Sequence, residues 1–538
     1  MRNQFVLYFE ANVPPMGAMA YFIEPHLERS FESVSVSFNR PIEAPSWLTA
    51  AMPGIVVSYA STSVTITNGD LLVRFSDSDG SIESFQSSAE PTPRKLQQAY
   101  FEYPSDNAWD NHYTFKSSGP ATKIDRFAGS RYGVDCFHTQ HQTSTQVSEI
   151  ADLPIDSRAM DRYTLCVRVF RCVRGSLVSE CYRVITPQIQ QLVRVYKGSN
   201  QIEVVDHVAP KSATDVVTRY ETDIDSQKRF VTDDNGLELV QRQFIDNDPK
   251  ILISGNYYPT VYVSGLQSEK DAGKQFLVVS DRPHGVTSSR SGEFEVMLHR
   301  NAKQVHGTRE CIQVSSRSLI HSRANTLAFQ SINRSNKPTG NGEELNEVNQ
   351  VAIVSWLLTQ SSDTDVRQKF VYHLNFPPMA VFSAAERSDW LASNRHTVAP
   401  LKADLPSNVF LMTMQQHGAQ SDLVALRLNH LVQADAVWAS PRNQPTSVQL
   451  ADLFKPAQYG IRSIEERTLS LNSVAEECKR HHWHPDKEPA HEPELGKMVA
   501  RESLKLSGDS RLEVELGPLD IRSFLIELEG PMPKPPGS

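Results

Sequence analysis

A dense group of potential metal ligands is the first feature of this 538-residue chain that could do chemistry. His481, His482, His484, Asp486 and His491 all lie in one short polar stretch. Imidazole and carboxylate groups are common zinc ligands. Prolines interrupt the stretch, however, which is typical of a surface loop whose histidines coincide by chance. We favour the loop and expect that this chain binds no metal.

Two other polar or aromatic segments attract attention. Tyr257 and Tyr258 could stack on the apolar face of a sugar ring, although two core aromatic residues in a strand are the simpler interpretation. Asp281 and Arg282, followed by the sequence Pro-His-Gly, predict a polar turn with a surface ion pair. By themselves, these segments indicate structure and not a site.

The motifs of several common chemistries are absent from the sequence. It contains no G-x-S-x-G, H-E-x-x-H or C-x-x-C motif and no P-loop, and the glycines at 340 and 342 have no third glycine at the spacing of a dinucleotide-binding loop. The sequence therefore indicates no independent nucleophile and no nucleotide site.

Charge and composition exclude further classes of protein. A net charge of -9 and a pI near 6.0 argue against nucleic-acid binding, which needs a basic face, and against docking on anionic lipid. No apolar run is long enough to span a membrane. No signal peptide is recognisable, and strand-like residues follow Met1 almost at once, so we expect the chain to begin inside a domain.

The six cysteines are too sparse for a disulfide scaffold. Cys172 and Cys181 flank a hairpin turn and could lie opposite each other. They could form a cross-strand disulfide or remain two buried thiols, and we favour the thiols. One glycosylation sequon begins at Asn333, which weakly favours a secretory route.

The hydrophobic pattern repeats every two residues, which predicts an all-β fold of half-buried antiparallel strands. Apolar and polar residues alternate in the segments 63–68, 71–75, 293–300 and 512–516. Helical signals are few, with the clearest at 383–394, and nothing resembles a βαβ unit, so a parallel sheet is not expected. From composition we expect a remnant of a small β domain at 1–58, a large β super-sandwich at 60–385, a linker at 386–406, a C-terminal β-sandwich at 407–530 and a disordered tail at 531–538.

Several segments, taken in order, resemble the β-domains of lysosomal-type α-mannosidases of glycoside hydrolase family 38. The resemblance implies that the large domain is galactose mutarotase-like and that nearly the whole chain is covered. Each segment is weak by itself, and the ordered set is specific. The segments are V-P-P-M-G at 13–17, F-V-T-D-D-N-G at 230–236, G-N-Y-Y-P at 255–259, S-D-R-P-H-G at 280–285, E-F-E-V-M-L-H-R at 293–300 and A-L-R-L-N-H at 425–430.

The resemblance implies a retaining hydrolysis of α-mannosides, with zinc and an Asp nucleophile held by an N-terminal α/β domain. Nothing in this chain matches that domain, so zinc is expected for the full enzyme and no catalytic residue is expected here. By motif position, Arg300 resembles the family's pocket arginine and Tyr113 the tyrosine of its S-G-A-Y-x-F segment. The chain departs from the pattern before Tyr113, and again in the loop that follows Arg300. We expect Arg300 to face solvent without a carboxylate partner.

We therefore expect this chain to be the C-terminal portion of an α-mannosidase. Its expected partners are a mannose-containing oligosaccharide of N-glycan type and an N-terminal catalytic domain or chain, with no nucleic acid and no membrane. The expected location is the lysosome or another secretory compartment. The alternative is a non-catalytic carbohydrate-binding or scaffolding β-protein derived from the family.

Overall fold

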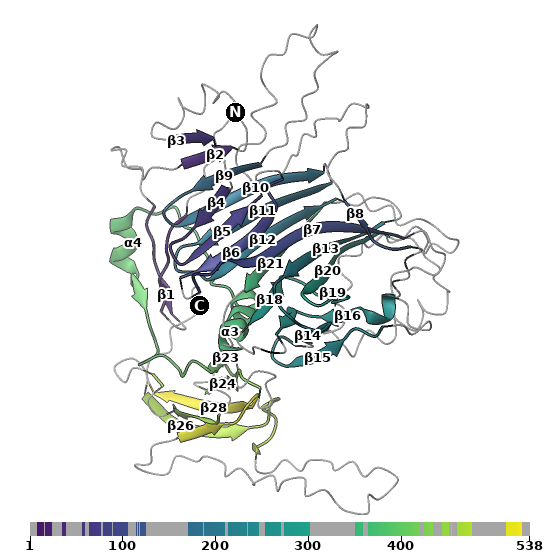
Figure 1. Cartoon of the computed structure of the whole chain (residues 1–538). Helices are drawn as coiled ribbons and strands as arrows, with labels where there is room; N and C mark the ends of the chain where they lie inside the picture. Colours follow the sequence, from purple (N-terminus) through teal and green to yellow (C-terminus); the bar gives the residue numbers. More distant parts are fainter. Residues whose placement is uncertain are drawn as a thin grey trace, which may run out of the picture. The chain divides into compact units, whose positions relative to one another are not determined.

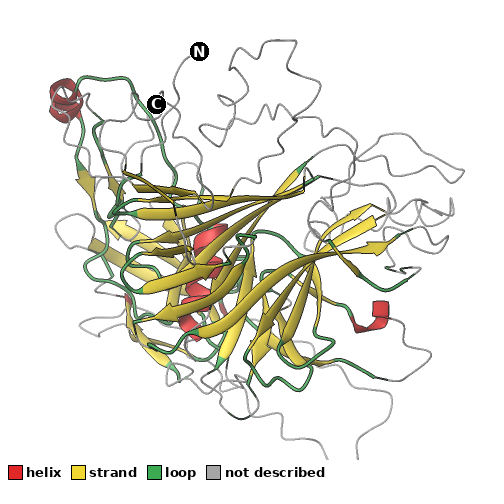
Figure 2. Ribbon diagram, turned by 45° about the horizontal axis from the view of Figure 1, so that its top comes forward, coloured by secondary structure: helices red, strands yellow, loops and turns green. Residues whose placement is uncertain are grey.

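A computed structural model of the chain divides it into two compact units, residues 1–10 with 27–362 and residues 11–26 with 363–538. The strands dominate and the helices are few (Figure 2). The structure describes residues 8–14, 17–23, 35–38, 56–59, 64–76, 79–88, 90–105, 115, 117, 119–124, 170–186, 188–209, 214–233, 235–246, 253–268, 270, 274–301, 350–358, 364–418, 423–433, 444–450, 453–454, 460–475 and 513–529.

The first unit contains an eleven-stranded sheet in the order β15-β14-β17-β18-β21-β12-β11-β10-β9-β2-β3 (Figure 1). The strand β21 lies between β12 and β18, although it is the last of the eleven along the chain. The strands are β2 (Ser35–Phe38), β3 (Val56–Tyr59), β9 (Phe170–Arg174), β10 (Val178–Thr186), β11 (Ile189–Tyr196), β12 (Gln201–Val208), β14 (Arg229–Asp233), β15 (Leu239–Gln243), β17 (Val263–Gln267), β18 (Gln275–Ser280) and β21 (Val351–Leu358).

A nine-stranded sheet completes the first unit, in the order β16-β19-β20-β13-β7-β6-β5-β4, with β8 paired to β7 beside this path. A short 3-10 helix, η2 (Ile253–Asn256), precedes β16. The strands are β4 (Val64–Thr67), β5 (Leu71–Phe75), β6 (Ile82–Ser87), β7 (Arg94–Pro104), β8 (Thr122–Lys123), β13 (Thr214–Thr222), β16 (Tyr258–Thr260), β19 (His284–Thr287) and β20 (Glu293–Asn301).

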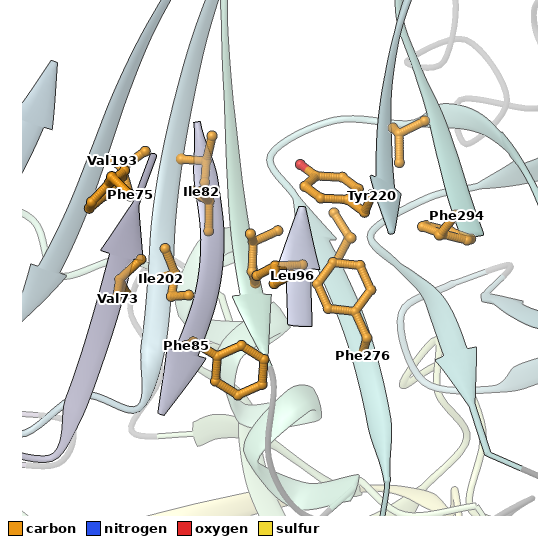
Figure 3. Close-up of a cluster of buried hydrophobic side chains, with 14 of the residues drawn as sticks. Val73, Phe75, Ile82, Phe85, Leu96, Val193, Ile202, Tyr220, Phe276 and Phe294 are labelled. Atoms are coloured by element: carbon orange, nitrogen blue, oxygen red, sulfur yellow. The ribbon is translucent and has the colours of Figure 1, made fainter. Parts of the chain in front are cut away.

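One hydrophobic core joins the inward faces of these two sheets, which makes the unit a sandwich (Figure 3). Both sheets contribute, with Phe75, Leu96 and Phe294 from the nine-stranded sheet and Ile202 and Phe276 from the eleven-stranded one. Each large apolar side chain buried in this way contributes about 1.5–3 kcal/mol. The prediction of a large antiparallel β super-sandwich from the two-residue pattern is confirmed.

The ladders between the described strands are antiparallel except one. The pair β2–β3 is parallel, with Ser35 opposite Val56, so this edge departs from the antiparallel pairing of the other ladders. The two strands are separated by enough chain to return in the same direction, which a hairpin cannot do.

Cys172 and Cys181 form a disulfide, with Cα atoms 4.1 Å apart. The two residues face each other directly in the β9–β10 ladder, and both are buried. The favoured interpretation as two thiols is therefore wrong, because the register brings the pair to bonding distance.

The second unit contains a four-stranded sheet, β23-β24-β28-β26, and two two-stranded sheets, β25-β27 and β1-β22. One core packs the four-stranded sheet against β25–β27, through Leu426, Phe524 and Val514 among others, so the predicted smaller β-sandwich is confirmed. The elements are β1 (Ala18–Met19), α3 (Thr364–Asn375), α4 (Arg387–Ser393), β22 (Thr397–Val398), β23 (Val409–Gln416), β24 (Leu423–His430), β25 (Thr446–Gln449), β26 (Gly460–Arg467), β27 (Glu513–Leu516) and β28 (Ile521–Glu529).

The predicted helix at 383–394 corresponds to α4, whereas α3 was not predicted. Among the described residues, neither helix has the length and apolar character needed to cross a membrane.

Candidate functional site

The site lies on the outer face of the nine-stranded sheet, which is the face of β7, β13 and β20 that points away from the main core. Alternation sends Val216 and Tyr220 of β13 into the core and Val217 outward. The irregularity in this ladder lies in β20, where Leu298 is skipped between Met297 and His299. On the outer face Val217 packs with Tyr103 and Met297 in a small separate cluster. Long-range strand pairing thus brings together residues that are far apart in the sequence.

Glu295 of β20 is the acceptor at the centre of this face. It is only 3% exposed, and it accepts hydrogen bonds from the Tyr103 hydroxyl at 3.0 Å, from the Tyr257 hydroxyl and from Arg219 Nε at 2.7 Å. Burial and the nearby Glu295 carboxylate raise the pKa of Tyr257 well above its usual value. Tyr257 therefore remains a protonated donor, fixed in position by a buried carboxylate.

Arg300 of β20 lies on the same face. Its Cζ is 5.4 Å from the centre of the Phe115 ring, and its Nε is 3.5 Å from Oδ2 of the fully buried Asp215. The expectation that Arg300 would have no carboxylate partner is wrong, because the β13–β20 register sets Asp215 directly opposite it. The side chain is 23% exposed, so its guanidinium is only partly covered.

Phe115 connects the arginine to the tyrosines. Its ring lies 5.3 Å from that of Tyr103 and 5.0 Å from that of Tyr257, with edge-on geometry in both cases. Phe115 is two residues after Tyr113, which lies outside the described residues. The histidine group at 481–491 and the sequon at Asn333 also lie outside them.

The other tyrosine of the pair packs elsewhere. Tyr258 has an edge-on contact with Phe230 at 5.6 Å, and Arg242 lies 5.0 Å from the centre of its ring. The two neighbouring tyrosines therefore pack on opposite faces of the sheet, Tyr258 beside the main core and Tyr257 in the outer cluster.

The turn at 281–282 has the predicted ion pair, with Arg282 Nη2 2.8 Å from Asp281 Oδ2. Arg282 also donates to the carbonyl of Ala352 at 2.7 Å, which ties the turn to β21. Two residues later, His284 is buried with Nδ1 2.8 Å from the carbonyl oxygen of Met297, and burial lowers its pKa to about 4. The turn and its histidine are thus anchored on neighbouring strands.

No group of three or more His, Cys, Asp or Glu side chains gathers as a potential metal site within the described part of the chain. The family resemblance implies a zinc ligand set in an N-terminal domain, and the described residues of this chain do not fit such a set.

Comparison with known proteins assigns the large domain. Residues 66–306 match the family described as glycosyl hydrolases family 38 C-terminal domain. This segment is a family 38 C-terminal domain. The match includes Arg300, Asp215 and the strands that carry them, so the outer-face site belongs to the family domain.

Several known proteins are similar to this chain. A probable α-mannosidase of Arabidopsis thaliana is 26% identical over 98% of this chain and 45% of its own length, and the lysosomal α-mannosidase of Homo sapiens is 25% identical over 66% of this chain and 32% of its own. A crystal structure of an α-mannosidase from Enterococcus faecalis V583 covers 88% of this chain and 44% of its own, at 10% identity and a TM-score of 0.48. The chain spans less than half the length of these relatives.

Proposed function

We propose that this chain is the C-terminal, β-rich portion of an α-mannosidase that hydrolyses terminal α-mannosides of N-glycan-type oligosaccharides. The observation that carries the proposal is the family 38 match over 66–306, which ends just beyond Arg300. In this proposal the chain supplies structural domains and part of the pocket rim, and the residues that break the glycosidic bond belong to another portion of the protein.

Arg300 is proposed to bind a sugar hydroxyl or a carboxylate at this rim. Its support is geometric: Asp215 holds Nε, Phe115 covers one face, and the partial exposure leaves the side chain accessible. A guanidinium fixed on two sides loses little rotational freedom when it binds, which favours recognition of one orientation of a ligand. Tyr113 is proposed to lie beside it, because Phe115 is already in contact with the arginine.

Zinc and the nucleophile are proposed to come from the portion of the protein that is not in this chain. When bound there, zinc would stabilise negative charge on a sugar oxygen. The residues of this chain would orient the sugar and exclude water from the rim.

An exposed apolar segment of the second unit supports a covering partner. Phe376 is 55% exposed, Met379 88%, Val381 83% and Phe382 84%, and they lie within seven residues of one another in the sequence. Contiguous exposed apolar groups of this kind mark interaction surfaces. We propose that the remaining, N-terminal portion of the family 38 protein packs over this segment.

Enzyme assays test the proposal. We expect the isolated chain with added zinc to give no turnover of an aryl α-mannoside, and the product of the reading frame extended upstream of Met1 to be active. In that longer protein Arg300→Met should lower kcat/KM about tenfold or more, equivalent to about 1.4 kcal/mol. The control Arg462→Met, at an exposed ion pair with Glu527, should leave it unchanged. Turnover by the isolated chain that a chelator abolishes would refute the proposal.

A second candidate is a non-catalytic carbohydrate-binding or scaffolding β-protein derived from the same family. One observation favours it: Asn301, Ala302 and Lys303 replace the acidic, glycine-bearing loop of the family pattern. A stop codon and a promoter immediately upstream of Met1 would favour this candidate, and an in-frame α/β domain with His and Asp ligands would exclude it.

The proposed location is the lysosome or another compartment of the secretory pathway. The lysosomal α-mannosidase among the relatives supports it, and so does the Cys172–Cys181 disulfide, because such bonds persist in oxidising compartments.

A further inference from the structure

The nine-stranded sheet is split along one edge of β7. The strand β6 pairs with β7 only at its beginning, where Ser84 and Phe85 face Lys95 and Arg94. The strand β8 takes the same edge only near the other end, where Phe101 and Glu102 face Lys123 and Thr122. After β8, the Ile124 amide still donates to the Tyr100 carbonyl at 2.9 Å, and between the two ladders the edge of β7 from Leu96 to Ala99 has no paired strand among the described ones. Within the described part of the chain, the sheet is therefore open at this place.

A cavity of about 560 Å³ occupies the split. Its walls include Ile82 of β6, Gln98 and Tyr100 of β7, Ile124 after β8, and Arg183 of β10 in the opposing sheet. This volume falls in the range of small-molecule sites, which is about 300–1,000 Å³. Because Arg183 belongs to the other sheet, the cavity reaches from the split into the space between the two layers.

A network of polar side chains lies at the inner end of this cavity. The Tyr100 hydroxyl donates to Asp206 Oδ1 at 2.5 Å, and Gln191 Nε2 donates to the same oxygen at 2.9 Å. Gln98 Nε2 donates to the Thr218 hydroxyl at 3.0 Å, and its Oε1 accepts from Gln191 at 2.9 Å. Burying these groups between two apolar layers costs free energy unless they are satisfied. The network is therefore a specific feature and not an accident of packing.

Arg183 is the incompletely satisfied member of the network. It is 5% exposed, and its Nε donates to Gln191 Oε1 at 2.7 Å. Its Nη2 is buried without a hydrogen-bond partner, and the buried Asp206 carboxylate attracts its charge with no salt bridge between them among the described residues. Leaving a buried donor unsatisfied costs about 1–3 kcal/mol, and more for a charged group. A ligand that accepts a hydrogen bond would remove this cost.

The charges of the cavity wall are balanced, which indicates a neutral ligand. Asp79 and Glu83 oppose Lys123 and Arg183. The wall residues Arg219 and Glu221 are already engaged with Glu295 and Lys95. An anion would be attracted by Arg183 but repelled by the two acidic side chains. A hydroxyl-rich molecule both donates and accepts, and can satisfy the two kinds of group together.

We propose that this cavity binds a neutral, hydroxyl-rich ring of the size of a hexose, with an oxygen of the ring or of a hydroxyl accepting from the Arg183 guanidinium. Arg219 of the outer-face cluster lines the cavity but Arg300 does not, and the inference does not depend on the proposed mannosidase activity. Tyr100 and Gln98 form the wall beside the ring, and Glu83 at the rim accepts from its hydroxyls.

Binding to the full 538-residue chain tests the proposal, using calorimetry or saturation-transfer NMR with methyl α-mannopyranoside, glucose and myo-inositol as probes. We expect saturable binding of at least one probe, weakened about tenfold or more by Arg183→Met and several-fold by Glu83→Gln. Circular dichroism and the thermal midpoint show whether each variant is folded, and Glu83→Gln provides the test if Arg183→Met is not.

Three results would overturn the proposal: no saturable binding of any probe, binding unchanged in both variants, or tighter binding of inorganic phosphate than of the neutral probes. The variant Arg300→Met distinguishes the two sites. Binding that is lost in Arg300→Met and retained in Arg183→Met would belong to the outer face, which would refute the cavity and support the rim. Loss in Arg183→Met alone supports the cavity, whatever the mannosidase assays give.

Discussion

Two buried polar clusters lie on opposite faces of the same strands, β7 and β13. The outer cluster consists of Tyr103, Arg219, Tyr257, Glu293 and Glu295, and it contains two carboxylates near one guanidinium. The interior cluster consists of Gln98, Tyr100, Arg183, Gln191 and Asp206, and its guanidinium forms no salt bridge with a carboxylate among the described residues.

The difference separates two uses of a buried arginine. Arg219 is surrounded by acceptors and stacks on Phe101 at 3.9 Å, so it is satisfied by the fold alone. Arg183 is held by one amide oxygen and lies 5.8 Å from the Tyr100 ring, and Asp206 attracts its charge without satisfying Nη2, which is buried without a hydrogen-bond partner. An arginine whose donors are all engaged is typical of a structural role, whereas a buried arginine with an unsatisfied donor beside a cavity indicates that a ligand supplies the missing acceptor.

The largest expected effect is in the outer cluster. Glu295→Ala removes the acceptor shared by Arg219, Tyr103 and Tyr257 and leaves a guanidinium buried without its closest partner. We expect the free energy of unfolding to fall by about 3–5 kcal/mol, measured by urea denaturation. The control Glu527→Ala, at an exposed pair with Arg462, should not shift the midpoint. Equal losses of unfolding free energy in the two variants would show that Glu295 does not stabilise the buried Arg219.

Replacing each arginine by methionine compares the clusters directly. Arg219→Met should cost about 3 kcal/mol, because it leaves the buried Glu295 without a cation, whereas Glu293 keeps its ion pair with Arg290. Arg183→Met should change the stability of the ligand-free protein by less than about 1 kcal/mol. The lost hydrogen bond to Gln191 and the lost attraction to Asp206 are offset because a buried charge with an unsatisfied donor is also removed. Denaturation of both variants under one set of conditions provides the measurement, and a larger loss for Arg183→Met would reverse the comparison.

The smallest expected effect is a change in pH dependence. Burial raises the pKa of the Asp206 carboxyl in the folded protein, so the folded state holds this proton more tightly than the unfolded state does. The contribution to stability is complete below the unfolded pKa, about 3.9, and is lost as the pH rises through the folded pKa. Asp206→Asn imitates the protonated form and should gain stability relative to the natural protein as the pH rises from about 4 to 7. Parallel stability curves for the two proteins would contradict the expectation.

Local features of the fold could be predicted from the sequence, because strand alternation and turn residues act over a few positions. The strands around Val64 and Leu71 and the turn at Asp281 all appear where the pattern placed them. The order of strands in a sheet depends on pairings between distant segments, and no local pattern encodes them. The interior cluster could not be predicted for the same reason. In the sequence, Gln98 and Asp206 are ordinary polar residues of two strands, and only the packing of β7 against β12 brings them together.

The candidate site was partly predictable. The family pattern identified Arg300, but not its carboxylate partner Asp215, because the pairing of β13 with β20 joins residues 85 positions apart. A sequence signal did exist: an acidic residue beside the apolar pair Val216 and Val217 of a strand, as Asp215 is, needs a compensating charge if it is buried.

The position of β21 has a consequence for how the chain reaches its folded state. This strand pairs with β12 on one side and with β18 on the other, so it joins the two parts of the eleven-stranded sheet (Figure 1). During synthesis both of those strands are complete long before Val351 emerges. Until then, the backbone hydrogen-bonding groups on the edge that β21 will occupy have no partner strand. Contacts of such long sequence separation form slowly, and waiting edges can pair with other chains. We therefore expect the interval between residues 280 and 358 to be the period in which the nascent chain depends most on chaperones.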